Sequence, residues 1–169
     1  MALHYIIKEP KVIAATNPVL ILLHGYGSNE EDLFSFAAEL PEHYYIVSVR
    51  APHDMHYGSY AWYAINFDAD ENKFSDIGQA KISRDLIAAF ITEITAKYPI
   101  NKNKVTLIGF SQGCILSYAV AVSYPEKVQQ IVGLSGYFNN EIAKENFESN
   151  NFSNLKMFSA HGTSDQVIP

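Results

Sequence analysis

Cysteine is almost missing from this chain, which has only Cys114 among its 169 residues. A single cysteine cannot form a disulfide within the chain, so a reducing compartment is favoured. The N-terminal stretch MALHYIIKEPK has neither a basic start nor a long apolar run, and it does not look like a signal peptide. We therefore expect a cytoplasmic protein.

Basic residues and long apolar runs are also scarce. Twelve Lys and Arg stand against eighteen Asp and Glu, which gives a net charge of −6 at pH 7, and the basic residues form no cluster. Nucleic-acid binders usually carry a basic face, and an anionic membrane surface repels an acidic chain, so neither partner is expected. The longest nearly apolar segment, residues 19–23, is far too short to span a bilayer.

The chain does have enough apolar residues for one packed core. Hydrophobic residues make up 48% and charged residues 18% of it, and a chain of this size buries roughly 70% of its unfolded surface. Neither of the glycine-rich phosphate-binding patterns, G-x-G-x-x-G and G-x-x-x-x-G-K-[ST], occurs. We expect a single domain over residues 1–169 that needs no structural metal and no cofactor.

Short apolar runs alternate with longer amphipathic ones. This order predicts a mostly parallel sheet with helices on both faces, an α/β sandwich of three layers. Helices are expected from Ser28, as the capping residue, and over 77–98 and 112–123. Two N-terminal runs, 3–8 and 12–15, are expected to pair antiparallel at one edge. The remaining strands are predicted at 19–23, 44–49, 105–108, 128–134 and 155–160, with a long, functional loop at 50–76.

The strongest chemical signal is GFSQG at residues 109–113, between a predicted strand and a predicted helix. G-x-S-x-G in that context is the nucleophile elbow, a strained turn whose flanking positions have no room for side chains. The helix start offers free amides and the positive end of a dipole, which stabilise developing negative charge. Ser111 is therefore the predicted nucleophile, and the alternative is a chance glycine-rich turn.

Two other turns fit the same chemistry. HGYG at residues 24–27 follows the strand 19–23, where a loop of an α/β-hydrolase contributes one amide to the oxyanion hole, and the residue after the serine contributes the other. The predicted donors are the backbone N–H groups of Tyr26 and Gln112. Asp165 follows the strand 155–160, where the acid belongs in the chain order Ser, Asp, His.

Taken together, GFSQG, HGYGSNEEDL, the stretch from Arg50-Ala51-Pro52 to Trp62, and HGTSDQVIP resemble the phospholipase/carboxylesterase family of α/β-hydrolases, which includes the acyl-protein thioesterases. The resemblance runs from about residue 19 to residue 169. It implies the α/β-hydrolase fold, no metal, and hydrolysis of carboxylic esters, thioesters included, through an acyl-enzyme on Ser111. It also implies that Asp165 is the acid and that Tyr26 and Gln112 are the oxyanion donors.

One departure from the family concerns the catalytic histidine, which the family places beyond the acid, after the next strand. Since no histidine follows His161, we expect the base, the final strand and the closing helix to be absent from these residues, and the chain as given to be nearly inactive. His53 and His56 are candidates for a substitute base. Their His-x-x-His spacing also suggests a metal site, but it lacks a third ligand at a known spacing.

Two consequences concern partners. Trp62 and Tyr63 are predicted to form an apolar wall for a small or lipid-like ester substrate, and the alternative is that each is simply a core residue. Without a following strand, residues 155–160 would be an open sheet edge, which predicts a homodimer. The alternative to an enzyme is a ligand-binding remnant of the same fold that has lost its catalysis.

Overall fold

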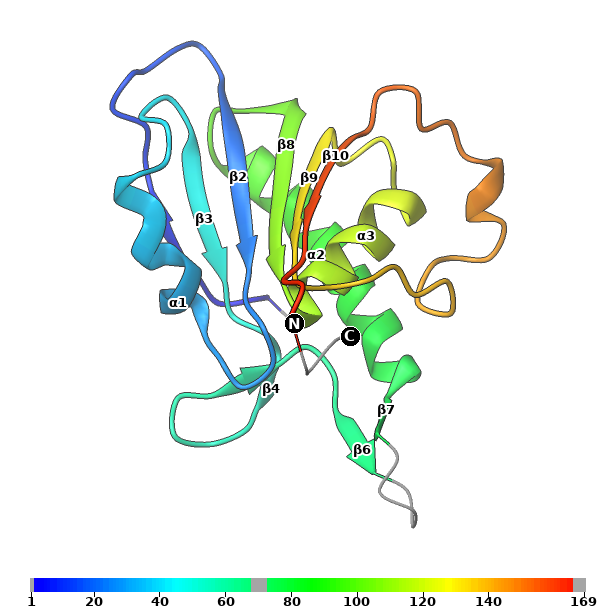
Figure 1. Cartoon of the computed structure of the whole chain (residues 1–169). Helices are drawn as coiled ribbons and strands as arrows, with labels where there is room; N and C mark the ends of the chain where they lie inside the picture. The colour runs from blue at the N-terminus through cyan, green and yellow to red at the C-terminus, as the bar shows by residue number, and fades with distance from the viewer. Residues whose placement is uncertain (1, 68–72, 166–169) are drawn as a thin grey trace.

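A six-stranded, mostly parallel sheet forms the centre of the computed structural model, which describes residues 2–67 and 73–165 (Figure 1). The strand order is β1-β3-β2-β8-β9-β10. The first strand runs antiparallel to its neighbour, and the other neighbouring pairs are parallel. The strands are β1 (Tyr5–Lys8), β2 (Asn17–Leu23), β3 (Tyr45–Val49), β8 (Ile100–Phe110), β9 (Gln130–Leu134) and β10 (Lys156–Ala160).

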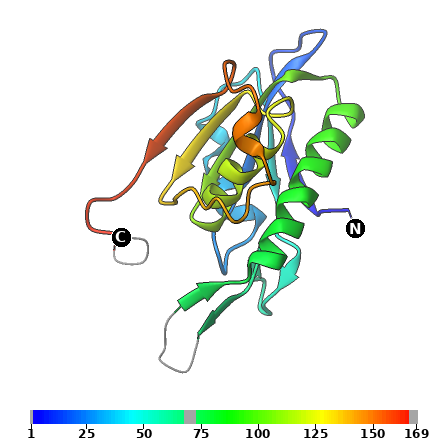
Figure 2. The same cartoon turned by 90° about the vertical axis from the view of Figure 1, so that its right-hand side faces the viewer.

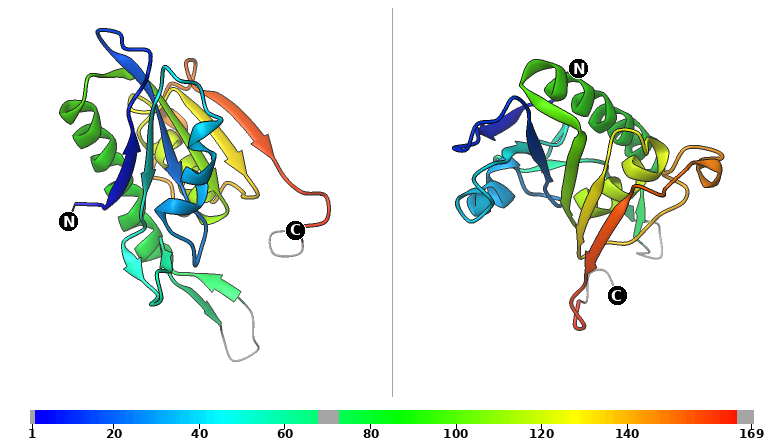
Figure 3. Two further views of the ribbon diagram at one scale, coloured as in Figure 1. Left: turned by 90° about the vertical axis from the view of Figure 1, so that its left-hand side faces the viewer. Right: turned by 90° about the horizontal axis from the view of Figure 1, so that it is seen from above.

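Helices cover both faces of the sheet, as the alternating sequence pattern predicted. The short helix α1 (Glu30–Phe34), continued by a 3-10 turn at Ser35–Ala38, lies on one face; α2 (Ile77–Lys97) and α3 (Gln112–Ser123) lie on the other (Figure 3). Strand β2 shows the reason. Its residues 19, 21 and 23 pack into the core beneath α2 and α3, and residues 20 and 22 pack on the α1 side. A strand buried on both faces needs an apolar residue at every position.

Helix α3 is buried almost all the way round. It packs against β8 and β9 on one side and against α2 on the other, and nearly every residue from Gln112 to Ser123 is buried. The run CILSYAVAV suits a helix that is buried on all sides because it has no polar face. The helix is thus held rigidly, and its N-terminus lies where β8 ends.

Strand β10 lies at the edge of the sheet (Figure 2). All five of its residues are exposed, including Met157 at 61% and Phe158 at 57%. Successive side chains of a strand point to opposite faces, so both faces of β10 are open to solvent. The expectation of an exposed edge at residues 155–160 is confirmed for this strand.

Two local predictions are wrong. Residues 12–15 form no strand; β1 pairs instead with β3, and Asn17 holds the intervening loop through its side chain, which bonds Val12 and Ala14. Ser28 is not the helix cap either. Asn29 caps α1 by accepting a hydrogen bond from the Glu31 N–H, while the Ser28 hydroxyl donates to Asp32. Asn and Ser are comparable caps, so composition alone did not separate these neighbours.

The long loop at 50–76 contains two small hairpins. Residues 68–72 of this loop lie outside the described part. One pairs β4 (His53–Asp54) with β5 (Tyr60–Ala61); the other pairs β6 (Ile65–Phe67) with β7 (Lys73–Ser75). The carboxyl ends of the parallel strands meet at the lower edge of the sheet in Figure 1, and both hairpins lie there too. This is the edge at which parallel α/β sheets bind their ligands.

Candidate active site

Ser111 occupies a strained turn between β8 and α3. Its backbone has φ 52° and ψ −116°, in a region that residues other than glycine rarely adopt. The Ser111 N–H donates to the Leu134 carbonyl at 3.0 Å, and its own carbonyl accepts from the Ile115 N–H at 3.0 Å. The surrounding hydrogen bonds therefore hold the strained conformation, as strain at functional sites requires. The predicted strand–turn–helix elbow is present.

The two glycines of GFSQG are there because neighbouring backbone leaves no room for a side chain. A Cβ on Gly109 would lie 2.3 Å from the carbonyl oxygen of Gly113, and one on Gly113 would lie 2.0 Å from the carbonyl oxygen of Leu23. Either contact would force β8 and α3, or β2 and α3, apart. This confirms the steric reason given for the motif.

The HGYG turn lies beside the serine. A Cβ on Gly25 would come within 3.4 Å of the Ser111 Cβ. The turn is braced by β5, because the Gly27 N–H donates to the Tyr60 carbonyl at 2.9 Å and the Tyr60 N–H donates to the Ser28 carbonyl at 2.8 Å. Gly27 has φ 75°, a left-handed conformation that suits glycine.

The two predicted oxyanion donors thus belong to adjoining elements. Tyr26 lies in this braced turn, and Gln112 is the first residue of α3, where backbone amides lack acceptors within the helix. Both residues therefore lie on elements that adjoin Ser111.

A buried hydrogen-bond network, which no sequence pattern predicts, joins the two turns. The Gln112 side chain accepts from the Trp62 N–H at 3.1 Å and donates to the Tyr63 carbonyl at 2.8 Å. The Trp62 indole N–H donates to the His24 carbonyl at 2.9 Å. The His24 ring in turn accepts from the Ala51 N–H at 3.0 Å. The partners of these hydrogen bonds are 27 to 50 residues apart in the sequence. No local sequence pattern therefore predicts them.

This network corrects the expectation that Trp62 and Tyr63 form an open pocket wall. The two residues are 0% and 1% exposed and belong to the main core cluster. Side chains with no accessible surface do not line an open pocket. Their backbone groups and the indole N–H fix the Gln112 side chain and the turn before Tyr26.

An ion pair holds the segment that follows the HGYG turn. The Arg50 guanidinium at the end of β3 makes two hydrogen bonds to the Glu30 carboxylate, whose side chain is 4% exposed. This pairing lowers the pKa of Glu30 below its ordinary value. Arg50 also lies over the Tyr60 ring, 4.6 Å from its centroid. One arginine thus links α1, β3 and the hairpin strand that braces the turn.

Asp165 lies in a tight turn after β10. Its N–H donates to the Gly162 carbonyl at 3.1 Å, and its carboxylate lies 3.5 Å from the His161 Nε2. The last residues of β8, β9 and β10 pair in register, so the turn begins two strands from Ser111, about 10 Å across the sheet. The structure places the predicted acid and nucleophile at the same sheet edge. Residues 166–169 of HGTSDQVIP lie outside the described part.

His53 and His56, the candidates for a substitute base, lie in the first hairpin of the 50–76 loop, where the buried Nε2 of His53 has no hydrogen-bond partner within the described residues and His56 has φ 69°. His53 lies in β4, and the His56 N–H donates to the Asp54 side chain in the turn of that hairpin. Within residues 2–67 and 73–165, no three His, Cys, Asp or Glu side chains come together in a group that could hold a metal ion. In that same part of the chain, no helix is both long and apolar enough to cross a membrane.

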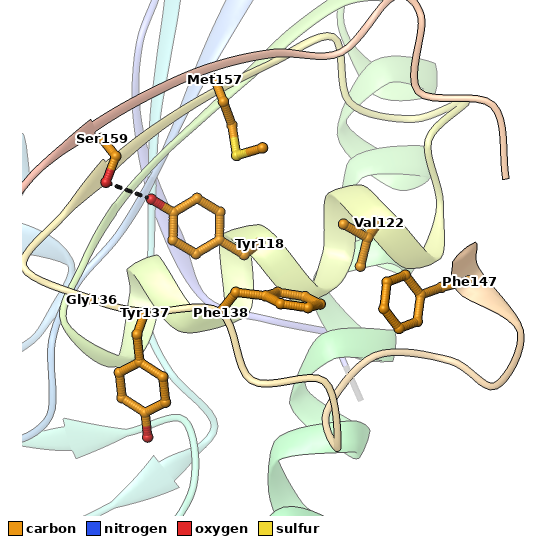
Figure 4. Close-up of a pocket in the computed structure, with 8 residues that line it drawn as sticks. All are labelled: Tyr118, Val122, Gly136, Tyr137, Phe138, Phe147, Met157 and Ser159. Atoms are coloured by element: carbon orange, nitrogen blue, oxygen red, sulfur yellow. Dashed lines mark hydrogen bonds between the residues drawn. The ribbon is translucent and has the colours of Figure 1, made fainter. Parts of the chain in front are cut away.

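A mainly apolar cavity of about 420 Å³ opens between α3 and β10 (Figure 4). The Tyr118 hydroxyl donates to the Ser159 hydroxyl at 3.0 Å across one side of it. At one end is Gly136, where an added Cβ would lie 3.2 Å from the Ser111 carbonyl oxygen. The cavity therefore starts beside the elbow. It is lined by Tyr118, Val122, Gly136, Tyr137, Phe138, Phe147, Met157 and Ser159.

The sequence model of the phospholipase/carboxylesterase family matches residues 4–169. The chain belongs to the phospholipase/carboxylesterase family. Among its relatives is acyl-protein thioesterase 1 of Yarrowia lipolytica, which is 31% identical in an alignment 167 residues long that covers 92% of this chain and 72% of the relative. The acyl-protein thioesterase 1 of Kluyveromyces lactis is 30% identical in an alignment 165 residues long that covers 89% of this chain and 71% of the relative.

Solved structures of esterases share the fold of this chain. Esterase PE8 superposes with a TM-score of 0.80 at 25% identity, covering 100% of this chain and 79% of that one. The carboxylesterase of Bacillus cereus superposes with a TM-score of 0.80 at 21% identity, covering 98% and 73%. The fold is the α/β-hydrolase fold, and the family and its relatives indicate an ester or thioester hydrolase.

Proposed function

We propose that this chain carries the nucleophile, acid and oxyanion hole of a serine hydrolase that cleaves carboxylic esters, thioesters included. The observation that carries the proposal is the strained Ser111 at the start of α3, with Gly25 of the HGYG turn against it. The amides of Tyr26 and Gln112 hold the oxyanion, and Asp165 orients the base. Preorganised donors of this kind are worth about 10²–10³ in rate each.

In the proposed reaction, a base takes the proton of the Ser111 hydroxyl while its Oγ bonds to the ester carbonyl carbon. The carbonyl electron pair moves to oxygen and is held by the two amides. When the carbonyl re-forms, the alcohol or thiol leaves with the proton, and water then releases the acid from the acyl-enzyme. We propose that the base is a histidine outside these 169 residues.

The proposed substrates carry an apolar acyl group. The cavity beside Gly136 supports this choice, since its walls come mainly from aromatic and aliphatic side chains and its volume suits a lipid-like chain. We further propose a cytoplasmic location, which the single cysteine supports, and association of two copies, which the open β10 edge supports.

A fluorophosphonate probe tests the proposal directly, because it forms a stable bond with an activated serine. The chain is incubated with the probe for hours, and its intact mass and peptide map are measured beside Ser111→Ala. One adduct on Ser111, absent from the variant, is expected. Equal labelling of the variant, or no labelling even with added imidazole as base, would overturn the proposal in favour of a non-catalytic binding domain.

A further inference from the structure

We propose that His24 is a positioning residue of the oxyanion hole: its ring holds the Gly25 carbonyl and thereby sets the direction of the Tyr26 N–H. This inference rests on the proposed function, because it takes the Tyr26 amide as an oxyanion donor. His24 itself is fully buried and does not touch the reacting atoms.

The hydrogen bonds of His24 define its protonation state. The Ala51 N–H can only donate, so the Nε2 atom that receives it at 3.0 Å carries no proton. The neutral ring then carries its proton on Nδ1, which lies 2.7 Å from the Gly25 carbonyl oxygen. A carbonyl only accepts, so the Nδ1–H donates to it. Each ring nitrogen thus has a single role, and a doubly protonated ring would face the Ala51 N–H with a second donor.

The Gly25 carbonyl and the Tyr26 N–H belong to one peptide unit. That unit is planar and trans, so its C=O and N–H point in opposite directions and rotate together. The Nδ1–H of His24 and the more distant N–H of Ser28, at 3.3 Å, hold the oxygen. Fixing the oxygen on the His24 side therefore fixes the amide on the other side.

The ring itself is held in place from several elements. The Trp62 ring lies 5.6 Å from it, and the Trp62 indole N–H binds the His24 carbonyl. The charged groups facing it are Glu30 and Asp32 of α1 and Arg50, the residue after β3. Burial outweighs them and lowers the pKa of His24, which favours the neutral ring. Because Trp62 also binds the Gln112 side chain, both donor turns share this support.

Two substitutions separate the two hydrogen bonds of the ring. In His24→Asn the side-chain amide reaches the position of Nδ1 and can still donate to Gly25. In His24→Gln the longer side chain reaches the position of Nε2, so it can still accept from Ala51 but leaves the Gly25 carbonyl without its donor. Each variant loses one of the two bonds, which makes them matched controls for stability.

The first readout is the rate of fluorophosphonate labelling of Ser111, followed by intact mass. His24→Gln is expected to label at least about 10-fold more slowly than the parent chain, and His24→Asn within about 3-fold of it, since misdirecting one donor removes much of its effect. Equal rates in the two variants would overturn the positioning role. Labelling of Ser111→Ala as fast as the parent chain, by contrast, would overturn the proposed function.

The second readout is independent of labelling. Nitrogen-15 NMR of the parent chain is expected to show the neutral tautomer with the proton on Nδ1, and the Tyr26 amide resonance is expected to shift in His24→Gln but stay near its position in His24→Asn. A proton on Nε2, or a Tyr26 resonance that moves equally in both variants, would contradict the proposal.

Discussion

Gly113 packs so closely on Leu23 that a Cβ on the glycine would stand 2.0 Å from the leucine carbonyl oxygen. Leu23 is the last residue of β2 and Gly113 the second residue of α3. The helix that begins beside the nucleophile therefore rests directly on the strand that leads into the HGYG turn. The two halves of the site share one backbone contact.

Replacing Gly113 by alanine is expected to lower the free energy of unfolding by about 3 kcal/mol or more, because the clash is with backbone that cannot rotate away. Urea denaturation followed by circular dichroism measures this. Gly162→Ala is the matched control, since its nearest heavy atom would be 3.9 Å away, and it should change stability by less than about 0.5 kcal/mol. Similar midpoints for the two variants would contradict the steric account.

The chain as given is expected to hydrolyse short p-nitrophenyl esters barely above background. Loss of the triad histidine lowers kcat by roughly 10⁶ in a well-studied serine protease. Added imidazole should partly replace the base and raise the rate above that of Ser111→Ala with the same imidazole, which accounts for the reagent's own reaction. A robust rate without imidazole that disappears in Ser111→Ala would instead implicate a base within these residues.

Replacing only one residue of the Arg50–Glu30 ion pair is expected to lower the free energy of unfolding. Arg50→Met removes the guanidinium from the buried Glu30 carboxylate, which keeps His4 Nε2 at 3.4 Å, and should lower the free energy of unfolding by about 2 kcal/mol, a value reduced by the partial exposure of the arginine. The Glu30→Gln/Arg50→Met double variant should recover at least half of that loss. A double variant no more stable than Arg50→Met would mean that the arginine acts mainly through Tyr60.

Stability is expected to depend on pH through His24. Burial lowers its pKa in the folded chain below the ordinary value of 6.5, so below that pH the unfolded chain binds a proton that the folded chain does not. Stability is therefore fully present above the ordinary pKa and declines as the pH falls through it, by up to about 1.4 kcal/mol per pH unit.

His24→Asn provides the comparison for this pH effect, since it removes the titrating ring and leaves the other histidines. Urea midpoints measured from about pH 8 to about pH 5.5 should fall more steeply for the parent chain than for the variant. Parallel curves would mean that His24 titrates alike in the folded and unfolded chain.

The open edge of the sheet is expected to associate. Sedimentation of the chain at rising concentration should show a dimer, because β10 presents unpaired backbone groups beside exposed Met157 and Phe158. Phe158→Lys should weaken the dimer. Ile82→Lys on α2 is the control, with a side chain of similar exposure, 60%, and it should leave the association unchanged. Equal effects would place the contact elsewhere.

Local sequence signals predicted the elements that carry the nucleophile. Helix α3 was predicted with its observed bounds, because the G-x-S-x-G turn marks its start and an unbroken apolar run marks its length. Strand β8 is predicted too short, since its first part, INKNK, is mostly polar and lacks the apolar pattern of the buried strand; the printed register pairs this part with β2 at Ile100. Tertiary contacts also decide which residue caps α1 and whether residues 12–15 form a strand.

The parts of the site that the sequence could not supply are those made by distant hydrogen bonds. His24, Trp62 and Gln112 have no common spacing or periodicity, and each alone has an ordinary structural interpretation. Trp62 is predicted as part of an apolar wall because an aromatic side chain near the serine suits an acyl chain. Its indole N–H and backbone find partners in the interior instead, as buried polar groups must.

Trp62 is the sole tryptophan of the chain, and it contacts the turns that hold both proposed oxyanion donors. Its intrinsic fluorescence is therefore a built-in, label-free reporter of this one region. Emission that changes before the far-ultraviolet circular dichroism during denaturation would show the site opening ahead of the sheet, as local unfolding of loops commonly does. Coincident changes would show that the two turns and the sheet lose their structure in a single cooperative step.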